Sequence, residues 1–323
     1  MTTDTALAAG AGLSRQRITR FIQDYGVYVA VALLLAFNAA FTDHFLQVAN
    51  LRTQLVQVAP VLIVALGMAL VIGSEGIDLS VGSVMALAAA VIPLYLGFGF
   101  WPAVLLALTA GAGAGLLNGV LVAVVRLQPI VATLALLVAG RGIALVIAGG
   151  QLKQIHNPTL LGLGSDNVAG VPLVVLIAAI LAVVIGLTVQ RTTYGRQLVA
   201  IGGNRAAAQL AGLPVKRVLI LTYVVCGVLA ALAGVLATAR LTASDASAIG
   251  NLMELSAITA VVVGGTPLTG GRVRVLGTVA GALLMQLLRA TMIKHDLSDS
   301  TAQMTQAAII LVAVYLARER RTR

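Results

Sequence analysis

Residues 53–83 read TQLVQVAPVLIVALGMALVIGSEGIDLSVGS, and no charged residue occurs in this stretch before Glu75. A helix that crosses the hydrocarbon core, which is about 30 Å thick, needs about 20 mostly apolar residues at a rise of about 1.5 Å per residue. The first part of the stretch meets this requirement. It therefore predicts a transmembrane helix that ends at a polar break containing glycine, after which a second apolar run begins.

The composition of the whole chain agrees with this stretch. Hydrophobic residues make up 59% of the chain, charged residues make up only 10%, and the mean hydropathy is +1.02. A soluble domain has about 25% charged residues, so this composition excludes a soluble globular class. A transmembrane β-barrel would alternate polar and apolar residues, whereas the apolar runs here are continuous. The sequence predicts an all-α, polytopic membrane protein.

About ten transmembrane helices fit into the apolar runs. We place them at residues 23–42, 54–73, 82–97, 102–125, 129–148, 170–189, 217–239, 252–265, 274–292 and 302–318. Together they form a single transmembrane domain, residues 23–318, with tails at 1–22 and 319–323. Most of the 21 Lys and Arg then fall on the side that holds both tails. The positive-inside rule assigns that side to the cytoplasm, so the net charge of +10 indicates topology and not nucleic-acid binding.

Two glycine-containing segments in different halves of the chain look alike, residues 71–82 (VIGSEGIDLSVG) and residues 262–271 (VVGGTPLTGG). If each half contains five spans, an odd number, the second half is inverted relative to the first, as in many transport proteins. We therefore expect an inverted internal repeat of two five-helix halves. The alternative is that glycine-rich turns recur by composition, because the chain contains 34 glycines.

The break after residue 73 places polar side chains between two apolar helices, namely Glu75, Asp78 and Ser80. A broken helix frees backbone groups, which are tolerated only where protein or a water-filled cavity satisfies them. These residues are therefore candidates for lining a translocation path. Alternatively, Asp78 and Ser80 are structural and cap the next helix.

Two further polar residues lie within predicted spans. Arg141 is a candidate for function, because a guanidinium in a span faces the interior or water and pairs with a carboxylate or with carbonyls. Glycines beside it also permit close helix packing, so a structural role is the alternative. Asn118 lies among small residues, and hydrogen bonding between helices is the simpler reading of this amide.

The segment 190–217 joins two spans on the predicted cytoplasmic side and is basic. It contains a predicted helix from Arg205 to Ala211, ended by Gly212 and Pro214. A short exposed helix of this kind suits a groove on a soluble partner. Alternatively it lies on anionic lipid headgroups, held by basic residues: Arg196, Arg205, Lys216 and Arg217.

Motifs for chemistry are missing from the sequence. It contains no P-loop, nucleophile elbow, zinc-protease helix or dinucleotide fingerprint. His44, His156 and His295 are scattered without metal-ligand spacing, and the lone Cys226 reads as a packing residue. We predict a protein that is not an enzyme and that holds no metal or cofactor of its own.

At this point the chain resembles ribose-type permeases of ATP-binding-cassette (ABC) importers. The resemblance rests on Gly76-Ile-Asp-Leu-Ser-Val-Gly82, on the segment from Gly195 to Asn204 with Ala211-Gly212, and on the segment from Ala260 to Gly271. It covers roughly residues 50–318. Ser74-Glu75 departs from the expected pattern, in which a short pair containing glycine stands there.

The resemblance implies a bacterial inner-membrane subunit that moves a small polar solute, most simply a monosaccharide. Its partners would be a cytoplasmic ABC ATPase that uses ATP and Mg²⁺, an extracytoplasmic solute-binding protein, and a second permease copy or paralogue, all assembled in membrane lipid. The ATPase would act on the segment 190–217, whose candidate coupling residues are Arg196, Gly203, Asn204, Arg205, Ala211 and Gly212.

Three other functions remain open from the residues. An ion-coupled secondary transporter would use Glu75, Asp78 or Arg141 for the coupling ion. An ABC permease could instead carry branched-chain amino acids or another small metabolite. A membrane scaffold would tolerate the loss of Asp78 and Arg141 without a solute phenotype.

Overall fold

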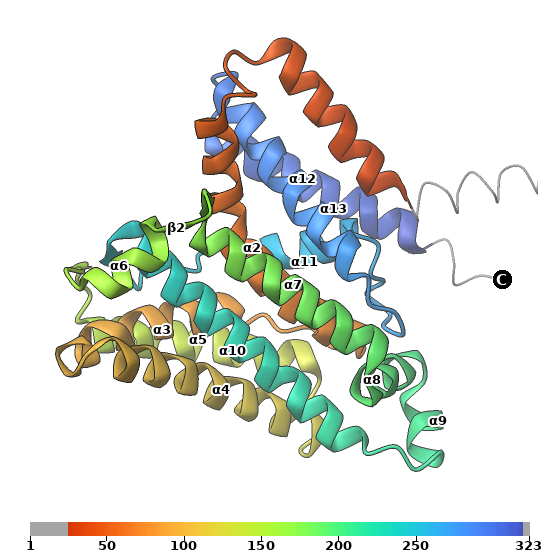
Figure 1. Cartoon of the computed structure of the whole chain (residues 1–323). Helices are drawn as coiled ribbons and strands as arrows, with labels where there is room; N and C mark the ends of the chain where they lie inside the picture. Colours follow the sequence, from red (N-terminus) through yellow and green to blue (C-terminus); the bar gives the residue numbers. More distant parts are fainter. Residues whose placement is uncertain (1–24, 319–323) are drawn as a thin grey trace, which may run out of the picture.

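The structure is a computed structural model that describes residues 25–318, so the predicted tails 1–22 and 319–323 lie outside the described residues. It is a bundle of apolar helices (Figure 1). The first is the helix Tyr25–Phe41. It is followed by α2 (Val48–Gly73), α3 (Val81–Tyr95), the 3-10 turn η1 (Leu96–Phe98), α4 (Phe100–Ala123), α5 (Pro129–Ala148), α6 (Pro158–Ser165), α7 (Leu173–Arg191), α8 (Thr193–Gly203), α9 (Arg205–Leu210), α10 (Val215–Leu241), α11 (Met253–Val263), α12 (Val275–Lys294) and α13 (Asp299–Arg318).

Each of the ten predicted spans coincides with one apolar helix. Within residues 25–318, seven helices are long and apolar enough to cross a membrane, namely α2, α3 with η1, α4, α5, α7, α10 and α12. The helices Tyr25–Phe41 and α11 are apolar but shorter, and α13 coincides with the last predicted span. The prediction of an all-α polytopic membrane protein is therefore confirmed.

Four short strands pair outside the long helices. β1 (Lys153–Gln154) pairs antiparallel with β4 (Ala243–Ser244), and β2 (Asn167–Val168) pairs antiparallel with β3 (Val171–Pro172). The helix α6 also lies in this connection, and its first turn is capped by Asn157, whose Oδ1 accepts a hydrogen bond of 3.0 Å from Leu160 N. Figure 1 shows α6 and β2 at one end of the bundle and α8 and α9 at the opposite end.

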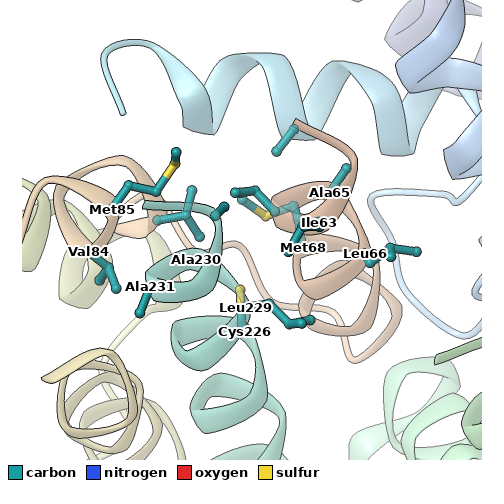
Figure 2. Close-up of a cluster of buried hydrophobic side chains, with 14 of the residues drawn as sticks. Ile63, Ala65, Leu66, Met68, Val84, Met85, Cys226, Leu229, Ala230 and Ala231 are labelled. Carbon is teal, nitrogen blue, oxygen red and sulfur yellow. The ribbon is translucent and has the colours of Figure 1, made fainter. Parts of the chain in front are cut away.

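The core of the bundle is built by α2, α3 and α10. Ile63, Met68, Met85 and Leu229 from these helices are among the buried side chains that meet there (Figure 2). Apolar burial alone does not drive helices together in lipid, so close packing at small residues contributes much of the association. Small residues bring α4 against α10, since a Cβ on Gly111 would lie only 2.5 Å from the carbonyl oxygen of Gly227.

The predicted span at 252–265 differs most from a simple crossing. α11 has eleven residues, fewer than the 17 or so that a spanning helix requires. The chain between α10 and α11, residues 242–252, runs along α3 instead. Ser244 Oγ donates a hydrogen bond of 2.6 Å to Ala89 O, and a Cβ on Gly250 would lie 2.1 Å from Gly82 O. A non-helical segment and a short helix together replace one long helix.

The two segments that look alike in sequence end their helices in the same way. At the end of α2, Glu75 has a positive φ of 66° and Gly76 N donates to Val71 O at 2.9 Å. At the end of α11, Gly265 has a φ of 87° and Thr266 N donates to Val261 O at 3.1 Å. Both are left-handed helix ends of the kind that satisfies the last carbonyls of a helix.

Candidate functional site

The break between α2 and α3, residues 74–80, is organised by Asp78. Its Oδ1 accepts hydrogen bonds from the backbone N of Ser80 at 3.0 Å and from the hydroxyl of Ser80 at 2.6 Å. The Ser80 side chain makes no capping bond to α3, although Ser80 stands at the N-cap position. The predicted cap is therefore replaced by a turn in which the carboxylate of Asp78 holds the residue that precedes α3.

Asp78 and Ser80 belong to one buried polar cluster with Asn118 of α4. The Asn118 Nδ2 group donates to Ser80 Oγ at 2.9 Å and to Asp78 Oδ1 at 3.4 Å. Both the Asn118 Oδ1 and the nearby hydroxyl of Tyr223 are buried without a hydrogen-bond partner among the described residues. The cluster joins three of the five predicted path residues, and Asn118 hydrogen-bonds from α4 to the link before α3 instead of to another helix.

Burial dominates the electrostatics of this cluster. Asp78 is 1% exposed. Burial raises the pKa of the Asp78 carboxyl above its ordinary value, and the hydrogen bonds from Ser80 oppose that rise. An ionised carboxylate removed from water is strongly destabilising unless charges or donors compensate it. The cluster supplies donors and no cation, so the local geometry favours the protonated carboxyl more than water does.

Glu75 lies apart from this cluster, at a junction of three glycine-containing segments. Gly271 N donates to Gly73 O at 3.0 Å, and a Cβ on Gly202 would lie 1.9 Å from the same carbonyl oxygen. A Cβ on Gly270 would lie 2.8 Å from the backbone N of Glu75. The end of α2, the end of α8 and the loop after α11 therefore meet with backbone against backbone.

The segment 190–217 forms two helices. α9 and its end at Gly212, whose φ is 77°, confirm the helix predicted from Arg205 onward. The helix α8 was not predicted, because its glycines and β-branched residues have a low helix propensity. Asn204 lies between the helices and caps α9, because its Oδ1 accepts a hydrogen bond of 2.9 Å from Ala207 N.

The other predicted coupling residues lie on the same end of the bundle. Arg196 lies in α8 and is exposed, whereas Arg205 begins α9 and is half-buried. Ala211 and Gly212 are exposed directly after α9, next to Leu210, which is 91% exposed. Gly203 has open space, since its Cβ would meet only the Gly271 Cα at 4.0 Å.

Arg141 extends from α5 to the segment 242–252. One of its terminal nitrogens donates to Ala246 O at 2.9 Å and to Ile249 O at 2.8 Å. Of the two kinds of partner expected for this guanidinium, a carboxylate or backbone carbonyls, the hydrogen bonds are made to backbone carbonyls. The arrangement brings Arg141 to a different part of the bundle from Asp78, so the predicted site residues do not form one cluster.

A cavity in the described part of the chain has a volume of about 710 Å³. It is lined by α2, α3, α10, α11, α12 and α13 and by the segment 242–252. Its polar lining consists of amides, one hydroxyl and two guanidinium groups: Gln57, Asn251, Gln286, Gln303, Ser256, Arg240 and Arg289. No Asp or Glu of residues 25–318 lines it, and none of Glu75, Asp78, Ser80, Asn118 and Arg141 does either.

An amide network lies at one wall of this cavity. The Gln286 Nε2 group donates to Gln54 Oε1 and to Gln57 Oε1, each at 2.8 Å. The sequence reasoning did not single out these glutamines, because single amides in apolar helices give no pattern by themselves. Their spacing at residues 54 and 57, on one face of α2, was the available signal. Amides and hydroxyls in a cavity of this size can bind a small polar molecule.

A family model described as "Branched-chain amino acid transport system / permease component" matches residues 50–314. The chain belongs to this permease family. No solved structure matches the chain.

Curated relatives extend over nearly the whole chain. The galactofuranose transporter permease protein of Escherichia coli is 39% identical over 302 residues, which cover 90% of this chain and 89% of the relative. The fructose import permease protein of Bifidobacterium longum is 36% identical, with 88% and 84% covered. The ribose import permease protein of Escherichia coli is 38% identical, with 88% and 91% covered.

Proposed function

We propose that this chain is the membrane-spanning permease subunit of an ABC importer that carries a monosaccharide. The observation that carries the proposal is the cavity of about 710 Å³, whose polar lining is made of amides, a hydroxyl and guanidinium groups. These groups hydrogen-bond to sugar hydroxyls without requiring a charged solute. The relatives, which are named for galactofuranose, fructose and ribose, support the same solute class.

The chain supplies only the translocation part of the importer. ATP and Mg²⁺ are bound by a partner ATPase, and a solute-binding protein delivers the sugar on the opposite side. A second permease, identical or paralogous, completes the membrane portion. We place the complex in the bacterial inner membrane with both termini in the cytoplasm, because this orientation puts most Lys and Arg of the connecting segments inside.

The ATPase contact is assigned to the segment 190–217. Its exposed tip at Leu210, Ala211 and Gly212 offers a surface to a soluble partner. The glycine junction passes any displacement of α8 directly to the end of α2 and to the loop after α11, because the backbones there touch without intervening side chains. Nucleotide-driven movement of α8 would thus reach both the Asp78 break and α11, which borders the cavity.

Two substitutions test the coupling role without disturbing the fold. Gly203→Asp fits because its Cβ has open space, and Asn204→Asp preserves an N-cap acceptor. Each adds negative charge at the surface that we assign to the ATPase. We expect both variants to insert normally and to lose most sugar-stimulated ATP hydrolysis and uptake in reconstituted vesicles. Normal uptake by both would remove this segment from the mechanism.

An ABC permease for a branched-chain amino acid is the second candidate. The observation that favours it is the pair Arg240 and Arg289 in the cavity, since guanidinium groups bind carboxylates. An ion-coupled transporter is supported less, because the cavity lining within residues 25–318 contains no carboxylate to bind a cation.

The decisive experiment purifies the tagged chain from its own membrane and assays the co-purified material for ATP hydrolysis. Candidate binding proteins are added loaded with pentoses, hexoses or branched-chain amino acids. ATP hydrolysis stimulated by a sugar-loaded binding protein is the expected result. Stimulation by an amino-acid-loaded protein would select the second candidate. Uptake that survives ATP depletion and collapses with the proton gradient would overturn both.

A further inference from the structure

A basic groove lies at the end of the bundle that carries α8 and α9. It has a volume of about 410 Å³ and is bounded by the end of α4, by α9 and by the start of α10. Four of its lining residues are cations, namely Arg126, Arg205, Lys216 and Arg217. No carboxylate of residues 25–318 lines the groove.

The charge of this groove is not neutralised within the described part of the chain. No side-chain hydrogen bond or ion pair joins any of these four cations to another residue between positions 25 and 318. Four like charges around one concave surface repel one another, and this repulsion is relieved by a bound anion. The groove is therefore electrostatically complementary to a negatively charged group.

Helix geometry adds to the positive potential. Lys216 and Arg217 are in the first turn of α10, which begins at Val215. The amide groups at a helix N-terminus carry a partial positive charge, so cations there are placed unfavourably and anions favourably. A site that concentrates cations at this position is stabilised by an anion more than by any neutral ligand.

The surroundings of the groove are apolar and exposed. Val124 and Val125, directly before Arg126, are 47% and 55% exposed, and Leu127 is 41% exposed. Leu221, one helical turn after Arg217 on the same face of α10, is 48% exposed. Exposed apolar side chains directly beside a cluster of cations are typical of a helix bundle at the boundary between acyl chains and lipid headgroups.

We propose that this groove binds the phosphate headgroup of an anionic phospholipid, with the acyl chains lying against the adjoining surfaces of α4 and α10. Basic pockets between transmembrane helices are a recurrent type of lipid headgroup site. A lipid covers the cations and the apolar flank together, whereas an acidic protein surface or a free phosphate would contact the cations only. The inference does not depend on the transported solute. Within the segment 190–217 it assigns the groove side, with Arg205, Lys216 and Arg217, to lipid and leaves the exposed tip at residues 210–212 to the ATPase.

The test measures lipid binding to the full-length chain in detergent by native mass spectrometry. The probes are phosphatidylglycerol and phosphatidylcholine with identical acyl chains, so that only the headgroup differs. The groove variant combines Arg126→Gln with Lys216→Gln. The matched control combines Lys153→Gln with Lys294→Gln, which removes the same charge near the other end of the membrane-spanning helices.

We expect the wild-type chain and the control to bind phosphatidylglycerol more tightly than phosphatidylcholine. The groove variant should bind phosphatidylglycerol about 30-fold more weakly, because each basic side chain near an anionic surface contributes roughly a factor of five. Its affinity for phosphatidylcholine should not change. The conservative variant Arg126→Lys should retain most of the binding, which separates loss of charge from loss of folding.

Several results would overturn the proposal. Equal phosphatidylglycerol binding by the wild type and the groove variant would remove the site, and equal losses in the control would show a general effect of charge. Displacement of the lipid by inorganic phosphate at equal concentration would indicate a free-anion site. Loss of ATPase co-purification in the groove variant, with unchanged lipid binding, would assign the groove to the protein partner.

Discussion

The two non-helical links of the bundle contain the same local turn in different surroundings. In the link 74–80, Asp78 Oδ1 accepts from the N and Oγ of Ser80 at 3.0 and 2.6 Å. In the link 242–252, Asp245 Oδ1 accepts from the N and Oγ of Ser247 at 2.9 and 2.6 Å. Each link follows one of the two longest helices, α2 or α10.

The surroundings decide what each turn does. Asp78 is 1% exposed and is joined by Asn118 from α4. Asp245 is only half-buried. The link that contains it, residues 242–252, accepts two hydrogen bonds from Arg141 of α5, at the carbonyl oxygens of Ala246 and Ile249. An Asp-x-Ser sequence is therefore sufficient for the turn, whereas the neighbouring helices determine whether its carboxylate is buried.

The largest expected effect comes from the point where the link 242–252 meets the first turn of α3, directly after the link 74–80. Gly250→Ala would place a Cβ 2.1 Å from Gly82 O at a backbone φ of 75°, so strain and overlap add. We expect a loss of about 3 kcal/mol in the free energy of unfolding, measured by denaturation in mixed micelles. Gly142→Ala is the control, because nothing lies within 4 Å of its Cβ. Equal stability of the two variants would contradict the close approach of the link 242–252 to α3.

The next prediction concerns Arg141 of α5, which hydrogen-bonds to one of the two links. Arg141→Ala removes two hydrogen bonds from a charged donor to the link 242–252 and none from the link 74–80. We expect about 2 kcal/mol of destabilisation and a loss of uptake, with intermediate values for Arg141→Lys, which keeps one donor group. Hydrogen exchange should increase in residues 242–252 only. An equal increase in both links would show that Arg141 does not act locally.

A matched pair of alanine variants compares the two carboxylates. Asp78→Ala leaves the N and Oγ of Ser80 without their buried acceptor, which destabilises by about 1–2 kcal/mol. Asp245→Ala is expected to change the free energy of unfolding by less than about 0.5 kcal/mol, because water replaces a partly exposed acceptor. Thermal melting of both variants in the same detergent gives the comparison. The reverse order would show that burial does not set the difference.

The smallest effect is the pH dependence of the two carboxylates. Burial raises the pKa of the Asp78 carboxyl. The contribution of this group to the free energy of unfolding therefore decreases as the pH rises above its pKa in the unfolded chain, about 3.9. Hydrogen bonds from Ser247 lower the pKa of Asp245, so its contribution is favourable above that value and is lost on acidification.

The melting temperature of Asp78→Asn relative to wild type should therefore rise between about pH 4 and 7, whereas that of Asp245→Asn should fall as the pH rises to about 4 from more acidic values. Melting curves of the three proteins at matched ionic strength measure both slopes. Slopes of the same sign would contradict the assignment of opposite environments.

Much of the fold follows from local sequence. The apolar runs located the ten helices that match the predicted spans, and the glycine-containing stretch after residue 73 located the break after α2, because hydropathy and helix termination depend on neighbouring residues along the chain. The short α11 was not predicted as such, since Ser244 and Gly250 satisfy a non-helical backbone only through contacts with α3. The lining of the cavity also escaped prediction, because it comes from six helices and the segment 242–252.

The class of protein, the places where the predicted spans begin and end, and the Asp-x-Ser turns follow from local sequence. They depend on hydrophobicity and on hydrogen bonds over a few residues. Only the tertiary structure decided that Asp78 is buried while Asp245 is not, that Arg141 holds the second link, and that glutamines and arginines line the cavity. Those properties depend on which helices meet, and in lipid that is determined by backbone approach at small residues distant in the sequence.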